Sequence, residues 1–164
     1  MAHVYIRRLA GFIGAVLLQV FILNHIHIAG YATPYLYIYF LLKLNAGVSR
    51  NVLMFWGFFL GLLIDMFSST PGLNAASAVL LAFVRQPVLR LFSPKELDNV
   101  TPSFGSLGTG VFVKYVVVAV LLHHAVLLGL EAFSFFDWPG LLLKIVLSSL
   151  FSIICILAIE CLRR

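Results

Sequence analysis

The sequence predicts an all-α integral membrane protein, a bundle of six transmembrane helices whose second helix is short. Three observations predict this class: 62% of the 164 residues are hydrophobic, only 10% are charged, and the apolar residues gather in six runs. This composition excludes an ordinary soluble domain. We therefore expect a single polytopic membrane domain over residues 1–164, with the lipid bilayer as its surroundings.

The lengths of the apolar runs place the predicted spans. A helix rises about 1.5 Å per residue, so about 20 residues cross a hydrocarbon core of about 30 Å. The second run is apolar only from Pro34 to Leu44 and rises about 16 Å as a helix. It must extend at its ends, lie where the bilayer is thin, or re-enter. The six predicted spans are about 8–28, 32–44, 51–67, 72–92, 109–133 and 138–162.

Lysine and arginine predict the orientation, because cytoplasmic flanks carry an excess of both. Six spans place both termini on one side, and every lysine and arginine except Lys144 falls on that side of the predicted bundle. The polar stretch 93–109 becomes a cytoplasmic loop, whereas the outer loops near 29–33, 68–72 and 134–137 contain neither base. We expect both termini in the cytoplasm. The bases that set this orientation are Arg7, Arg8, Lys43, Arg50, Arg85, Arg90, Lys95, Arg163 and Arg164.

A glycine-rich face marks the third span. Gly57, Gly61 and Asp65 fall four residues apart, so they share one side of the helix. Small residues let a neighbouring backbone approach closely, and an acid within a span faces the bundle interior. The turn after Asp65 contains Pro71 and Gly72, and residues 74–78 open the fourth span with small side chains. We predict that the glycine face packs against residues 74–78.

The same turn predicts where the fourth helix starts. Thr70 precedes Pro71, which fits an N-cap followed by proline in the first turn, so we expect the helix to begin at Thr70. Arg85 lies about 12 Å deeper than Asp65 by helical rise, and we expect it to mark the cytoplasmic interface instead of pairing with that acid. The candidates for helix packing or partner contact are Gly57, Gly61, Asp65, Pro71, Gly72, Asn74 and Arg85.

Three charges form a predicted intramembrane cluster. Asp65, Glu131 and Lys144 all lie in the outer part of their spans. A lone amine there is costly, so we predict that Lys144 pairs with Asp65 or Glu131 inside the bundle. The charges have either a functional role or a purely structural one, in which an ion pair only holds the helices together. We give the structural role more weight.

No motif in the sequence indicates catalysis. His124 and Glu131 are seven residues apart in the fifth span, but the chain contains no His-Glu-x-x-His run that would bind zinc. Cys155 and Cys161 suit neither a metal site nor a disulfide. No residue pattern supplies an activated nucleophile with its base. We therefore expect that the protein is not an enzyme and that it binds no cofactor, no metal and no nucleic acid.

The stretch from Gly57 to Ala76, which reads GFFLGLLIDMFSSTPGLNAA, resembles the signature of the rod shape-determining membrane protein family MreD. Glycine, then aspartate, then a small-residue turn is the family pattern. The likeness extends from the Pro34-Tyr-Leu-Tyr-Ile-Tyr-Phe segment through Arg85 to the span with His123, His124 and Glu131, and so covers most of the chain.

This resemblance implies a non-enzymatic subunit of the bacterial cell-elongation complex in the cytoplasmic (inner) membrane. Such a subunit supports cell shape and lateral peptidoglycan synthesis by binding MreC, with MreB, the RodA glycosyltransferase and a class B penicillin-binding transpeptidase as further partners. MreD proteins are similar in fold to the substrate-binding S components of ECF vitamin transporters, which are the alternative function. An ion channel that uses the intramembrane acids is a more distant alternative.

Overall fold

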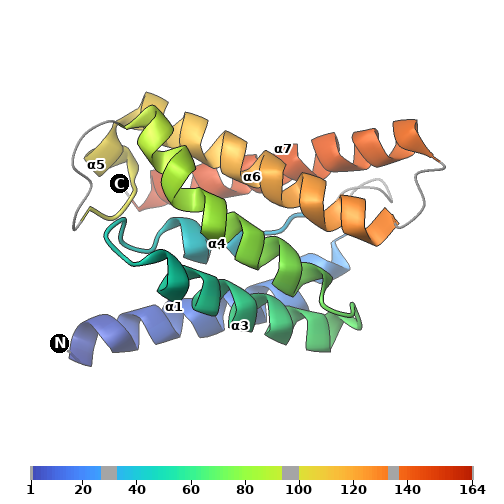
Figure 1. The fold of residues 1–164 in the computed structure, drawn as a ribbon, viewed down its shortest axis with the longest axis horizontal. Coiled ribbons are helices and arrows are strands. Elements are labelled where there is room, and N and C mark those ends of the chain that lie inside the picture. Colours follow the sequence, from blue (N-terminus) through green and yellow to red (C-terminus); the bar gives the residue numbers. More distant parts are fainter. Residues whose placement is uncertain (1, 27–32, 94–99, 133–136, 164) are drawn as a thin grey trace.

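A computed structural model describes residues 2–26, 33–93, 100–132 and 137–163, and the regular elements in these ranges are all helical (Figure 1). Five of the described helices are long and apolar enough to cross a membrane. They are α1 (Ala2–Phe21), α3 (Arg50–Ser68), α4 (Leu73–Phe92), α6 (Thr109–Ala132) and α7 (Trp138–Leu162). The short 3-10 helix η1 (Leu23–His25) follows α1, and the apolar stretch of this span runs from Arg8 to His25. Two short helices are α2 (Ile38–Leu42) and α5 (Phe104–Leu107).

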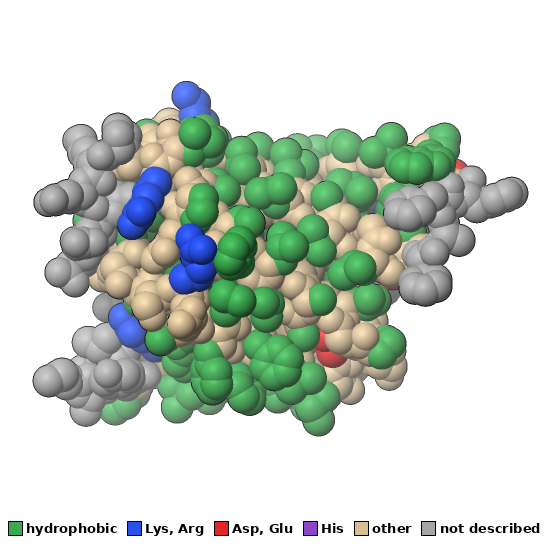
Figure 2. Space-filling model, viewed as in Figure 1, with side chains coloured by type: hydrophobic (Ala, Val, Ile, Leu, Met, Phe, Trp, Pro, Cys, Tyr) green, Lys and Arg blue, Asp and Glu red, His purple; other side chains and the backbone are tan. Residues whose placement is uncertain are grey.

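The long helices lie along the long axis of the molecule, and the labelled chain ends lie toward the same end (Figure 1). The most extensive helix contact is between α3 and α4, followed by those of α4 with α6 and of α6 with α7, while α1 lies against α3. On the visible face, lysine and arginine gather at the end that carries α5 and the N-terminus (Figure 2). We call this the basic end. Lys95 and Arg164, two of the bases used for the predicted orientation, lie outside the described residues.

The second apolar run does not form the predicted 13-residue helix. Only Ile38–Leu42 is α-helical, and the described residues before it are mostly non-helical. The run lies beside α7: the Thr33 N–H donates to the Ser148 hydroxyl (3.3 Å), and the Tyr39 hydroxyl donates to Glu160 (2.7 Å). Ser148 and Glu160 are about 18 Å apart along a helix. The run therefore passes through the bundle interior toward the basic end. We call residues 33–44 the buried run.

Side chains from two helices satisfy the backbone of this run. Non-helical backbone is tolerated at membrane depth only where protein or water supplies its hydrogen bonds. Gln19 in α1 accepts from the Leu36 N–H (2.9 Å) and donates to the Pro34 carbonyl (3.1 Å). Ser152 in α7 accepts from the Tyr35 N–H (2.9 Å). Gln19 and Ser152 thereby replace helical hydrogen bonds that the run does not make.

Helices α3 and α4 meet through small residues. A Cβ placed on Gly57 would lie 2.8 Å from the Ala78 carbonyl oxygen, and one on Gly61 would collide with the backbone of Ala75. The two helices are therefore too close for any side chain at Gly61. This places the glycine face against residues 74–78.

The fourth helix begins later than predicted. Helix α4 starts at Leu73, after Gly72 at a φ of 78°. Thr70 is not its N-cap, because the Thr70 hydroxyl donates to Asp65 (2.6 Å). The exposed Pro71 belongs to the turn, whose start at Ser69 also has a positive φ of 54°. The left-handed residues on both sides of the turn reverse the chain before the helix can start.

Candidate functional site: buried charges and a groove at the basic end

Asp65 accepts hydrogen bonds from the first turn of the next helix, α4. Its two carboxylate oxygens accept from the backbone N–H groups of Asn74 (3.0 Å) and Ala75 (2.9 Å), from the Asn74 amide (2.9 Å) and from the Thr70 hydroxyl. The side chain is 5% exposed. An anion at a helix N-terminus satisfies donors that have no partner within the helix and interacts favourably with the helix dipole. Asp65 thus acts as a cap for α4, supplied from α3.

The predicted cluster of three charges does not form. Lys144 lies 3.1 Å from Glu131, and both side chains are exposed on the surface, at 36% and 43%. Asp65 instead takes its hydrogen bonds from the turn and from α4. The structure therefore brings together Glu131 and Lys144, places their pair at the surface instead of inside the bundle, and leaves Asp65 out of it.

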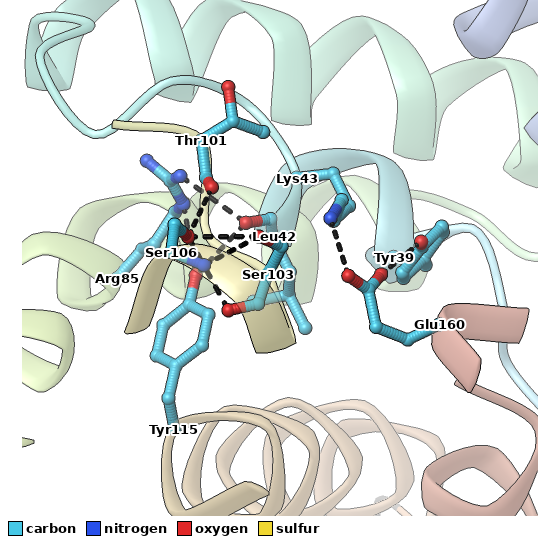
Figure 3. Close-up of polar contacts among 9 residues, drawn as sticks. All are labelled: Tyr39, Leu42, Lys43, Arg85, Thr101, Ser103, Ser106, Tyr115 and Glu160. Atoms are coloured by element: carbon cyan, nitrogen blue, oxygen red, sulfur yellow. Dashed lines mark hydrogen bonds and ion pairs between the residues drawn. The ribbon is translucent and has the colours of Figure 1, made fainter. Parts of the chain in front are cut away.

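Arg85 is buried in the bundle, which corrects its predicted place at the interface. Its side chain is fully buried. Nη2 donates to the carbonyls of Leu44 and Leu42 (3.3 Å for Leu42), and Nε donates to the Tyr115 hydroxyl (3.1 Å; Figure 3). The Leu42 carbonyl ends α2 and the Leu44 carbonyl lies two residues beyond it, and a cation is favourable at the C-terminal end of a helix. Arg85 therefore joins α4 and α6 to the end of the buried run.

A chain of polar side chains crosses the bundle centre from Asp65. Asn74, which donates to Asp65, accepts from the Tyr37 hydroxyl (3.1 Å), and that hydroxyl lies 2.7 Å from His123 Nε2. The neighbouring His124 contacts the Ser152 hydroxyl (3.0 Å). Among the described residues, no three His, Cys, Asp or Glu side chains lie together as metal ligands would. The contacts join α3, α4, α6 and α7 around the buried run.

A second polar cluster lies at the basic end. Glu160 in α7 accepts from Lys43 (2.9 Å) and from the Tyr39 hydroxyl (Figure 3). Glu160 was not among the candidate residues from the sequence. The sequence contained one signal that could have identified Glu160: it is an acid that stands among the bases at the end of the last predicted span. Spacing could not have paired it with Lys43, because the two are 117 residues apart.

A groove opens beside this cluster. It has a volume of about 690 Å³ and lies between α1, residues 36–45 and α7. Arg8, Lys43 and Arg163 line it together with apolar residues that include Leu18 and Leu36. None of these was a candidate site residue from the sequence. The three basic residues meet in one groove because the buried run brings Lys43 between Arg8 and Arg163, which lie near the two ends of the chain.

The apolar helices and their exposed apolar side chains define a multi-pass, all-α membrane protein (Figure 2). No family model, no curated protein and no solved structure matches this chain.

Proposed function

We propose that the chain is a non-enzymatic, MreD-like subunit of the bacterial cell-elongation complex, located in the inner membrane with both termini in the cytoplasm. In this role it binds MreC and, with MreB, RodA and a class B transpeptidase, supports cell shape and lateral peptidoglycan synthesis. The resemblance of residues 57–76 to the MreD signature is the starting point. The contacts of these residues support the proposal further.

The single observation that carries the proposal is the joint between α3 and α4. Gly61 and Asp65 both contact the first turn of α4, and Asn74 links this joint to Tyr37 in the buried run. The residues that make up the signature therefore act together to hold two helices and a buried segment in place. This arrangement suits a rigid membrane scaffold, whose chemistry belongs to its partners.

The transporter alternative is less well supported. For an S component we would expect an outward-facing polar cavity lined by charges in the outer part of the spans, such as Asp65, Glu131 and Lys144. Asp65 is occupied by donors from the turn and α4, while Glu131 and Lys144 pair at the surface. The described groove opens at the basic end, which we expect to face the cytoplasm because lysine and arginine gather there.

Co-purification with MreC from the same organism tests the proposal. The intact chain, extracted in mild detergent, should retain MreC. The Glu131–Lys144 pair is exposed at the end opposite the basic end, where we expect the membrane-proximal part of MreC, so Lys144→Ala should reduce the retained fraction. Lys114→Ala, which changes an exposed lysine near the start of α6, is the matched control and should retain MreC fully.

Two results would contradict this function. One is a wild-type chain that loses MreC under conditions in which its fold is preserved. The other is saturable binding of a vitamin, measured as quenching of the fluorescence of Trp56 and Trp138, which would support the transporter alternative. A gene position beside those of MreB and MreC would add independent support, whereas neighbouring genes for an ATPase pair and a coupling subunit would favour transport.

A further inference from the structure

The groove at the basic end has two kinds of lining. Arg8, Lys43 and Arg163 supply positive charge, and Tyr39, Asn45 and Thr101 add polar groups. The rest of the lining consists of small or apolar residues from α1, from the buried run and from α7. A ligand that fills the groove must therefore combine a negatively charged part with an apolar part.

The charge of the groove comes mainly from its two arginines. Glu160 accepts from Lys43 at 2.9 Å and neutralises it. Arg8 and Arg163 come from opposite ends of the chain and line the same groove. Among the described lining residues there is no acid, so the net charge at this position is positive.

The depth of the groove matches one leaflet of a bilayer. Arg8 and Leu18 both line it and are ten residues apart on α1, which corresponds to about 15 Å along a helix. The hydrocarbon core of a bilayer is about 30 Å thick, so a leaflet contributes about half of that. The groove runs from headgroup depth at Arg8 toward the bilayer centre at Leu18.

The α1 side of the groove is open because its residues are small. A Cβ on Gly14 would meet no atom within 4 Å, and one on Gly11 would only touch the ring of Phe40 at 3.6 Å. A larger residue at Gly14 would extend into the groove without disturbing the packing of α1. Gly14 therefore offers a way to fill the groove while the fold is kept.

We propose that the groove binds one anionic phospholipid from the leaflet at the basic end. The lipid phosphate lies between Arg8 and Arg163, and one acyl chain follows Gly14 and Leu36 toward the bilayer centre. A partner's transmembrane helix also matches an apolar wall, but it supplies no fixed anion at the depth of the two arginines, whereas a lipid phosphate does. The inference does not depend on the proposed role in cell elongation.

Native mass spectrometry of the purified chain in detergent tests the site. The chain is titrated with dioleoyl-phosphatidylglycerol and, in parallel, with dioleoyl-phosphatidylcholine, which has the same acyl chains and no net charge. We expect the anionic lipid to bind more tightly. Arg8→Gln and Arg163→Gln should each weaken its binding about fivefold, since a basic residue near a membrane surface contributes that much toward an anionic lipid. Gly14→Leu should weaken the binding of both lipids.

Three matched variants control for charge and size. Arg90→Gln and Lys114→Gln each remove an exposed base that does not line the groove. Gly110→Leu enlarges a glycine of α6 where an added Cβ would also meet no atom within 4 Å. All three should bind phosphatidylglycerol as the wild type does.

Three outcomes would overturn the proposal. The first is equal affinity of the wild type for the two lipids. The second is unchanged phosphatidylglycerol binding in the double variant Arg8→Gln/Arg163→Gln. This outcome is decisive even where the Gly14→Leu variant does not fold. The third is displacement of the lipid by millimolar inorganic phosphate, which would indicate a simple anion site without an acyl chain.

Discussion

Asp65 and Arg85 are both buried, and main-chain groups provide two of the hydrogen bonds of each. Asp65 accepts from the N–H groups that begin α4, and Arg85 donates to the carbonyls that end α2. Burying a charge is costly unless hydrogen bonds compensate for the lost water. Here the compensation comes from helix ends, where backbone donors or acceptors lack partners within the helix. The same contacts fix where each helix begins or ends.

Asp65→Ala should destabilise the protein. The substitution leaves two backbone N–H groups and one N–H of the Asn74 amide buried without their acceptor, which costs about 1–3 kcal/mol of unfolding free energy. Asp65→Asn should cost less, because one acceptor oxygen remains. Thermal unfolding of the purified chain in detergent measures both changes.

The matched control is Asp137→Ala. Asp137 caps α7 through a single hydrogen bond from Gly140 (3.1 Å), and it is exposed to its surroundings. Its loss should cost about 1 kcal/mol or less. If Asp65→Ala unfolded at the wild-type temperature, the capping role of Asp65 would be refuted.

At the scale of elements, the α3–α4 contact depends on the absence of side chains. Gly61→Ala should destabilise the bundle strongly, because its Cβ would collide with the backbone of Ala75 and the helices would have to separate. Overpacking of this kind costs about 1–3 kcal/mol. Gly129→Ala, with no atom within 4 Å of the added Cβ, should leave the unfolding temperature unchanged or raise it. Equal stability of the two variants would contradict the close contact.

The buried run depends on specific serines of α7. Ser152→Ala removes the acceptor of the Tyr35 N–H and the partner of His124, so hydrogen exchange at Tyr35 should become faster. Ser149→Ala is a control from the same helix, because the buried Ser149 hydroxyl has no hydrogen-bond partner in the structure. It should be neutral. Faster exchange in both variants, or in neither, would show that Ser152 does not hold the run.

Several elements could be predicted from the sequence because apolar runs have the length of a bilayer. The third, fifth and sixth spans match α3, α6 and α7 to within a residue or so at each end. The glycine face was predictable because four-residue spacing places small side chains on one side of a helix. In contrast, the first helix extends from Ala2 and ends at Phe21, where the apolar run continues into η1.

The contacts of the buried run could not be predicted in the same way. Gln19, Ser152 and Glu160 bind it from positions 17, 117 and 121 residues away in the sequence. No local pattern encodes such pairings. Arg85 was misplaced for a related reason: its depth suggested an interface, but its partners are carbonyls whose position depends on the path of that run.

At the scale of the whole molecule, the buried run explains how five long helices are compatible with termini at one end. Five crossings alone would leave the two termini on opposite sides of a membrane. The run returns the chain from α1 toward the basic end beside α7, so the next long helix, α3, begins at the same end as α1. We predict that this segment, whose backbone is held by side chains of α1 and α7, provides a sixth crossing.

Mapping the sides of the membrane tests this sixth crossing. Single cysteines introduced at Ala2, Ser69 and Arg163, in a background with Cys155→Ser and Cys161→Ser, are labelled in intact cells with a membrane-impermeant maleimide. We expect labelling at Ser69 only, with Ala2 and Arg163 labelled once the membrane is opened. Labelling of one terminus but not the other in intact cells would contradict the sixth crossing, because the termini would then lie on opposite sides of the membrane.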